Sequence, residues 1–211
     1  RMLRKYYFSQ SIKKHRALFT LTNSTYIYTI SNYSSSSINY YLDEKPCDIF
    51  YPPLKLKNEI AWDREQDILK KYNVLNDSFF LLSSASRWTK NNYRALVALT
   101  NLFDKDKIDD DFKVIVLGCD NKHKSYYQRM LGIKNNFSYY DYASDAELEV
   151  LYKNAFLFIY PSLLEGFGSP PVEAMQYGTL CLCSTSTSIT EVCGDAVIYF
   201  DPTDVPSIEM A

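Results

Sequence analysis

Residues 161–175 read PSLLEGFGSPPVEAM and join a predicted strand to a predicted helix. The run before them, residues 156–160, is apolar and too short for a buried helix, which indicates a strand buried on both faces. Two of the six glycines in the chain flank Phe167, where they allow the backbone to approach a ligand closely. Pro170 and Pro171 suit the first turn of a helix. The stretch therefore predicts a strand, a tight turn and a helix, which is the repeating unit of an α/β sheet.

The same alternation of strand and helix extends over most of the chain. The clearest helix is predicted at residues 145–154, where Ser144 and Glu147 form a capping box at its start. Another helix is predicted at residues 91–103. Because strand and helix alternate at least five times, we expect an α/β fold with a doubly wound parallel sheet. The predicted strands, each expected to be buried on both faces, are residues 79–82, 114–117, 137–140, 156–160, 180–183 and 197–200.

The first 57 residues have a different pattern. They predict helices at residues 15–22 and 34–42 and short strands at residues 26–30 and 48–51. We interpret residues 1–57 as the end of a truncated α/β domain with its crossover, and residues 58–211 as the doubly wound domain. The last strand is followed by Asp201-Pro202 with no closing helix predicted, so we expect a sequence cut at both ends.

Composition excludes several classes of protein. The chain has 211 residues, of which 46% are hydrophobic and 23% charged, with a net charge of -2, which argues against disorder and against a nucleic-acid partner. Its longest apolar stretch, residues 155–161, is far shorter than the roughly 20 residues that span a bilayer. No basic amphipathic segment is present, so we expect membrane contact to be peripheral at most. The five cysteines are odd in number and lie mostly in apolar runs, which indicates reduced thiols and a cytoplasmic protein.

The candidate site follows from the sheet. In an open parallel sheet, ligands bind at the carboxyl ends of the strands, so we expect the site in the loops 83–91, 118–122, 141–144, 161–169 and 184–188. Glu165 precedes the glycine turn, and Glu173 is expected in the first turn of the helix, whose N-terminus favours a phosphate. Because a diphosphate would repel a carboxylate, we expect Glu173 to bind neutral vicinal hydroxyls such as those of ribose. Glu165 could hold sugar hydroxyls or stabilise positive charge at a sugar carbon. The alternative is that Glu173 complements the helix dipole and Glu165 is a solvated loop acid.

Residues 165–178, EGFGSPPVEAMQYG, closely resemble the E-x7-E signature of family 4 retaining glycosyltransferases, which have the GT-B fold. The resemblance extends over roughly residues 24–206 and concerns mainly the C-terminal, donor-binding domain of that family. Weaker matches to the family pattern lie at residues 31–33, 51–53, 90–91, 144–148, 190–196 and 201–202.

The resemblance implies transfer of a sugar from a UDP- or GDP-sugar to a glycan or lipid-linked acceptor, with retention of configuration, in polysaccharide biosynthesis. It implies no metal and no other cofactor. Glu165, Lys90 and Arg87 are the implied catalytic residues, with the two cations neutralising the leaving diphosphate, a role that fixed cations can fill without Mg²⁺. For both cations the alternative is solvated surface charge. The implied donor-binding residues are Gly166, Phe167, Gly168, Ser169, Glu173, Tyr142 and Ala143, with Glu173 at the ribose and the last two at the base.

Other interpretations stay open at this point. The chain could be a non-catalytic nucleotide-sugar binding module, or a nucleotide-sugar epimerase of the same architecture. Asp104 and Asp106 form a D-x-D sequence that could bind a metal, but its place between a helix and the next strand indicates a solvated turn. The acceptor side of the GT-B cleft normally belongs to the N-terminal domain. We therefore expect that the isolated 211-residue chain, without the missing part of that domain, transfers sugar poorly.

Overall fold

The computed structural model describes residues 2–42, 47–55 and 60–211, with side chains in the first helix from residue 13 onward. The chain divides into two compact units, Arg1–Pro53 and Leu54–Ala211, and each is described here by itself. The predicted boundary between residues 57 and 58 lies outside the described residues. Among the described helices, none is both long and apolar enough to cross a bilayer.

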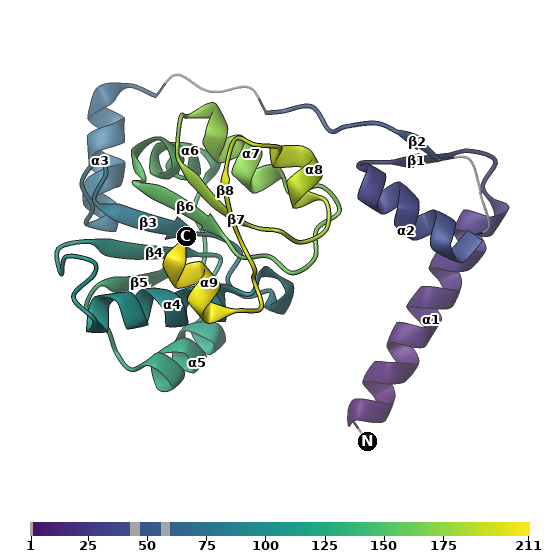
Figure 1. Cartoon of the computed structure of the whole chain (residues 1–211), viewed down its shortest axis with the longest axis horizontal. Helices are drawn as coiled ribbons and strands as arrows, with labels where there is room; N and C mark the ends of the chain where they lie inside the picture. The colour runs from purple at the N-terminus through teal and green to yellow at the C-terminus, as the bar shows by residue number, and fades with distance from the viewer. Residues whose placement is uncertain (1, 43–46, 56–59) are drawn as a thin grey trace. The chain divides into compact units, whose positions relative to one another are not determined.

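The N-terminal unit contains α1 (Met2–Asn23), β1 (Ile27–Thr29), α2 (Asn32–Leu42) and β2 (Cys47–Ile49), and its two strands pair in parallel (Figure 1). The first helix is longer than predicted, because residues 2–23 contain no glycine or proline to end it. The second helix begins before the predicted Ser34, since the hydroxyl of Ser31 accepts a hydrogen bond from the Ser34 amide at 3.0 Å and caps the helix.

The C-terminal unit is built on six described parallel strands in the order β5-β4-β3-β6-β7-β8. The predicted doubly wound sheet is therefore confirmed. The chain winds outward from β3 through β4 to β5 and then returns to the other side of β3, where β6 pairs with it through Leu81 and Phe158. The neighbours β3 and β6 form the topological switch point of the sheet. The strands are β3 (Phe79–Leu82), β4 (Lys113–Leu117), β5 (Phe137–Tyr140), β6 (Leu157–Tyr160), β7 (Cys181–Ser184) and β8 (Ile198–Phe200).

Helices cover both faces of this sheet (Figure 1). One face packs against α3 (Trp62–Tyr72), α6 (Asp145–Asn154), α7 (Ser169–Gln176) and α8 (Ile189–Cys193). The other face packs against α4 (Asn92–Asp104), α5 (Asn121–Leu131) and α9 (Val205–Met210). The predicted capping box of α6 is present, with both Ser144 and Glu147 in their expected roles.

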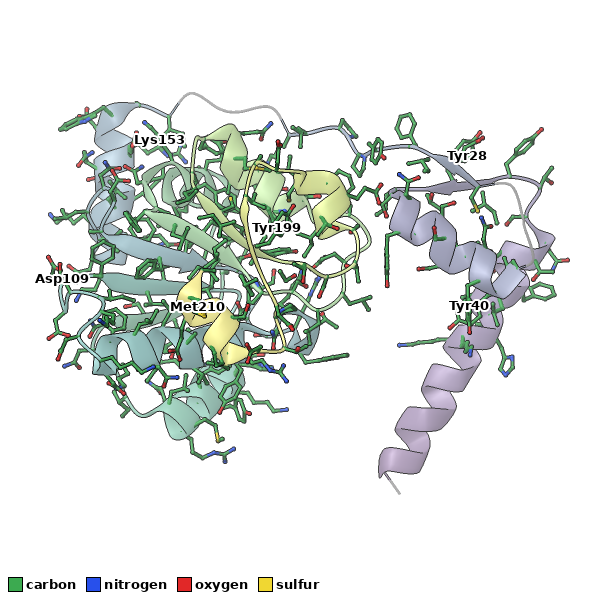
Figure 2. The ribbon with its side chains drawn as sticks, in the orientation of Figure 1. Tyr28, Tyr40, Asp109, Lys153, Tyr199 and Met210 are labelled. Carbon is green, nitrogen blue, oxygen red and sulfur yellow. The ribbon has the colours of Figure 1, made fainter. Side chains whose placement is uncertain are left out.

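Two expectations about the sheet and its end are wrong. Strands β5 and β8 are only partly buried, because each lies at an edge of the sheet with a single neighbour, whereas the inner strands are buried on both faces. The chain also has a closing helix, α9, after the last strand. The carboxylate of Asp204 accepts a hydrogen bond from the Ser207 amide at 3.1 Å, and Ile208 is buried against the α4 side, while Met210 projects outward (Figure 2).

The D-x-D sequence and the cysteines both have structural explanations. The acids of the D-x-D sequence lie at the exposed end of α4 before β4, at the opposite edge of the sheet from the carboxyl ends, and Asp109 in the same turn points outward (Figure 2). The solvated-turn interpretation is thus confirmed. All five cysteines are unpaired, and Cys119, Cys181, Cys183 and Cys193 are buried as small core residues.

Gly118 supplies a backbone conformation that the loop after β4 requires. Its φ is +64°, and a Cβ at this position would lie 3.0 Å from the Cα of Ser84. We expect Gly118→Ala to lower the free energy of unfolding by about 2–3 kcal/mol, because it combines left-handed strain with a backbone clash. Gly178→Ala is the control, since its φ is +83° but nothing lies within 4 Å, and it should cost only about 1 kcal/mol. Equal losses in urea unfolding would show that the clash is absent.

Candidate functional site

Two loops meet at the carboxyl ends of β3 and β6. The loop after β3 ends in a short 3-10 helix, η1 (Trp88–Lys90), and residues 161–168 follow β6. The backbone joins them directly, because the Leu163 amide donates to the Thr89 carbonyl at 2.7 Å, and the Ser162 hydroxyl lies 3.1 Å from the same oxygen. Residues far apart in the sequence are thereby held at the switch point, where open α/β sheets bind ligands.

Lys90 and Glu165 form a mostly buried ion pair at this point. The Lys90 Nζ lies 2.6 Å from Glu165 Oε1, and the two side chains are only 10% and 13% exposed. The hydroxyls of Tyr160 and Ser162 also donate to Oε1, at 2.8 and 2.5 Å. No described residue donates a hydrogen bond to the second carboxylate oxygen, Oε2. The arrangement orients the carboxylate through one oxygen and leaves the other for a ligand.

Tyr160 connects both members of the pair. Its hydroxyl lies 2.6 Å from the Lys90 Nζ and accepts a hydrogen bond from it, while donating its own proton to Glu165. Burial, together with the adjacent Glu165 carboxylate, raises the pKa of Tyr160 far above its usual value, so the phenol stays protonated. The sequence indicated Tyr160 only as an apolar strand residue.

The turn around Glu165 is held from the loop after β7. The Glu165 amide donates to Thr187 Oγ1 at 3.0 Å, and the Ser188 hydroxyl lies within hydrogen-bond distance of the carbonyl oxygens of Glu165 and Phe167. The predicted contribution of loop 184–188 to this edge is therefore present. The individual roles of Thr187 and Ser188 had no signal in the sequence beyond the clustering of hydroxyls.

Gly168 starts the helix that follows. It caps α7 with a φ of +97°, a left-handed conformation that glycine adopts without strain, and Pro170 and Pro171 occupy the first turn as predicted. The helix begins already at Ser169, which places Glu173 in its second turn. The expectation of Glu173 in the first turn is therefore wrong, because Ser169 precedes the prolines within the helix. Gly166 and Phe167 lie in the turn itself.

Glu173 lines a hollow whose lining does not include Glu165. This hollow, of about 110 Å³, lies between α6 and α7, and its lining includes Glu149 and Lys55. Burial raises the pKa of Glu173 above its ordinary value of 4.5, while the charge of Lys55 opposes the rise and that of Asp145 adds to it. The two glutamates of the E-x7-E sequence therefore have separate surroundings, one with a fixed cation in contact and one partly desolvated.

The remaining predicted residues lie apart from the Lys90–Glu165 pair. Arg87 is exposed and forms no ion pair with a described residue, in contrast to Lys90. Tyr142 is 78% exposed, and Ala143 packs against the core beside α6. The structure brings together Lys90 and Glu165, whereas Arg87, Tyr142 and Glu173 do not contact that pair. Their roles toward a donor stay predictions.

Asn91 has a structural role beside Lys90. Its side-chain Nδ2 donates to the carbonyl oxygens of Pro161 and Pro202, at 3.1 and 2.7 Å, and its Oδ1 accepts from Arg94 at 2.7 Å. The side chain thus joins the loop after β3 to the loops after β6 and β8. Of the Lys-Asn pair in the family resemblance, Lys90 is the residue that faces the carboxylate.

We expect Tyr160→Phe to lower the free energy of unfolding by about 1.5–3 kcal/mol, because it removes a buried hydroxyl bonded to two charged groups while keeping the ring that stacks on Phe158. Turnover in a transfer assay should fall roughly tenfold, since Lys90 and Glu165 lose their common partner. Tyr139→Phe is the control, because the Tyr139 hydroxyl has no hydrogen bond to a described residue. Similar urea unfolding and turnover for both variants would contradict a positioning role for Tyr160.

Two solved structures have a fold similar to that of this chain. HepE from Anabaena in complex with UDP-glucose has a TM-score of 0.75 with 13% sequence identity, over 93% of this chain and 55% of that one. A glycosyltransferase from Rickettsia africae has a TM-score of 0.70 with 16% identity, over 88% of this chain and 51% of that one. These likenesses show the fold, which is that of the GT-B glycosyltransferases.

A family model described as glycosyl transferases group 1 matches residues 63–210, which include β3 to α9 and the complete Lys90–Glu165 site. The chain belongs to this family.

Two curated relatives are mannosyltransferases of O-antigen chains. RfbU from Salmonella typhimurium is 26% identical over 216 residues, covering 99% of this chain and 54% of its own length. O-antigen chain mannosyltransferase B from Escherichia coli is 49% identical over 70 residues, covering 33% of this chain and 18% of its own length. The chain therefore spans about half the length of RfbU and a smaller share of the second relative.

Proposed function

We propose that this chain is the donor-binding part of a retaining mannosyltransferase. It would move mannose from a nucleotide-diphosphate donor, with UDP or GDP as the nucleotide, to a glycan or lipid-linked acceptor in polysaccharide biosynthesis. The family membership and the names of the mannosyltransferase relatives support this proposal. The observation that carries it is the buried Lys90–Glu165 pair at the switch point of the sheet.

The pair provides the two electrostatic elements that such a reaction needs. Negative charge builds on the diphosphate as it leaves, and Lys90 is a cation already fixed and largely desolvated beside it, so little reorganisation is required. The N-terminus of α7 adds positive potential at Gly168. Glu165 presents Oε2 to sugar hydroxyls or to positive charge at the reacting carbon. The absence of a metal requirement is part of the proposal, and unchanged transfer in excess EDTA is the expected result.

Glu173 would hold the ribose in this proposal. Its hollow between α6 and α7 is close to the start of α6, where Tyr142 and Ala143 precede Ser144. An ionised carboxylate accepts hydrogen bonds from two vicinal hydroxyls, which compensates part of the cost of burying it. The raised pKa of Glu173 is consistent with a carboxylate that lacks such partners in the free chain.

We expect Glu173→Gln to weaken binding of UDP or GDP roughly tenfold, because a charge-assisted hydrogen bond to the ribose is lost. The same substitution should stabilise the free chain at neutral pH. Since the folded chain has the higher Glu173 pKa, it binds more protons than the unfolded chain just above pH 4.5, and wild-type stability falls as pH rises through this window. The free energy of unfolding of Glu173→Gln should therefore exceed that of wild type only above pH 4.5, and the difference should grow as the pH rises.

Calorimetric titration with nucleotide and urea unfolding between pH 4 and 8 measure both effects. Glu149→Gln is the matched control, because Glu149 lines the same hollow from α6 but has no predicted contact with the nucleotide. Equal nucleotide affinity for wild type and Glu173→Gln would remove the ribose assignment.

The proposed function is tested by thermal shift with UDP, GDP and their mannose conjugates, followed by a transfer assay on the complete protein. A ligand present at 100 times its Kd should stabilise the native state by about 2.7 kcal/mol. Binding without turnover of any donor would favour the non-catalytic module, and an epimerised donor would favour the epimerase. The proposal includes a cytoplasmic location, which the reduced buried thiols support.

A further inference from the structure

A second hollow, of about 840 Å³, lies on the α4–α5 side of the sheet. We call it the α4–α5 groove and define it by Arg87, Trp88, Arg94, Lys122, His123 and Tyr126, which line it from η1, α4 and α5. Its volume is within the range of roughly 300–1,000 Å³ that is typical of small-molecule sites. The hollow around Glu173 lies on the opposite face of the sheet, between α6 and α7.

The groove has an excess of positive charge. Arg87, Arg94 and Lys122 line it, and no acidic side chain does so among the described residues. The nearby Asp120 is engaged by His123, whose amide and Nδ1 lie 2.9 and 2.8 Å from one carboxylate oxygen. Arg87 and Lys122 are exposed and form no ion pair with a described residue. Three cations without acids in the same lining favour a negatively charged ligand.

Aromatic rings and apolar side chains complete the lining. The Trp88 side chain is 78% exposed, and Tyr93 and Tyr126 pack together with ring centroids 5.8 Å apart. Val97, Leu163 and Val205 add apolar surface. Exposed aromatic faces pack well against the apolar face of a sugar ring, while guanidinium and ammonium groups bind phosphate. A free phosphate would leave the rings uncovered, and a flat membrane surface would not fill a concave groove.

We propose that the α4–α5 groove binds a phosphorylated saccharide at a site separate from the donor site. The site does not depend on the proposed function, because the lining of its cavity does not include Lys90, Glu165 or Glu173. In this proposal Arg87 serves the groove and not the donor diphosphate. The groove adjoins the donor site through Leu163, which lies two residues before Glu165 in the same loop.

The test uses fluorescence of Trp88 in the full chain. The sequence contains two tryptophans, so Trp62→Phe makes Trp88 the single reporter. Titration with mannose 6-phosphate should give a saturable change, with mannose and inorganic phosphate each at least tenfold weaker. Saturating UDP and GDP should change the Kd by less than twofold. Lys122→Glu should weaken binding at least tenfold, whereas Lys124→Glu, on the same helix but outside the lining, should weaken it less than threefold.

Four outcomes of these titrations would overturn the proposal, and a fifth comes from vesicles. The four are the absence of a saturable signal, displacement of mannose 6-phosphate by UDP or GDP, equal affinity for inorganic phosphate, and equal effects of the two lysine variants. Vesicles containing anionic phospholipid form a further arm, and stronger binding to them than to mannose 6-phosphate would assign the groove to a membrane surface instead. Unchanged melting temperatures of both variants exclude unfolding as the cause of weaker binding.

Discussion

Lys90→Met is expected to lower the free energy of unfolding by about 3–5 kcal/mol. The reason is the carboxylate that remains: Glu165 is 13% exposed, and without Lys90 its charge has only the hydroxyls of Tyr160 and Ser162 as close partners. Removing one member of a buried ion pair leaves an uncompensated charge, which costs more than the pair itself contributes. Urea unfolding at pH 7 measures the loss.

The double variant Lys90→Met with Glu165→Gln separates this explanation from a simple loss of packing. Because neither charge remains, it should recover more than half of the stability lost by Lys90→Met alone, which gives a large coupling energy in a double-mutant cycle. The control is Lys105→Met, which removes the partner of Glu209 at a site where the lysine is 58% exposed, and it should cost less than about 1 kcal/mol. If Lys90→Met lowers the free energy of unfolding no more than Lys105→Met does, burial does not raise the cost of leaving Glu165 without its cation.

Glu165→Gln is expected to lower turnover by about 10²–10³-fold, while the affinity for UDP or GDP changes less than twofold. The amide has nearly the same shape as the carboxylate, so the turn should keep its bonds to Thr187 and Ser188. It loses the negative charge that faces the donor sugar, and removal of one preorganised electrostatic group costs about this much in other enzymes. Transfer measured on the complete protein, together with calorimetric titration of the nucleotide, separates the two quantities.

Glu173→Gln serves as the reciprocal control, with weaker nucleotide binding and turnover at saturating donor close to that of wild type. A Glu165→Gln variant that binds nucleotide as poorly as Glu173→Gln would contradict the division of roles between the two acids. Because Glu165 also neutralises Lys90, Glu165→Gln is expected to lower the melting temperature, and both variants are compared at a temperature well below their own unfolding transitions.

Much of the fold was predictable, because it rests on short-range pattern. The apolar runs became strands, and the capping box at Ser144 and Glu147 started α6 where expected, since its hydrogen bonds join residues only three apart. The wrong predictions for β8 and for the end of the chain concern features that depend on packing between distant residues and not on short-range pattern. The exposure of β8 depends on its place at the sheet edge, and α9 is stabilised by burial of Ile208, which no local pattern after Asp201 announced.

The candidate site was predictable only in part. Parallel strands bring the loops after each of them to one edge, so the set of candidate loops follows from the order of strands and helices in the sequence. The place of Glu165 before the glycine turn indicated a role toward a sugar, whereas the role of Lys90 came from a family resemblance. Their contact had no signal in the residues themselves, because it joins positions 75 apart. Tyr160 was missed as a site-forming residue, and Asn91 was named only with Lys90 in the family resemblance. Each acts through partners on other strands or loops.

By itself, then, the sequence determined which segments become strands and helices, where α6 and α7 begin to within a residue or two, and which loops share an edge of the sheet. These properties depend on side-chain periodicity, capping and proline geometry within a few residues. Only the tertiary structure decided that β3 lies beside β6, that Lys90 therefore reaches Glu165, and that Glu173 lines a hollow of its own. Strand order and burial arise from packing of the whole chain, so residues distant in sequence become neighbours only when the sheet is complete.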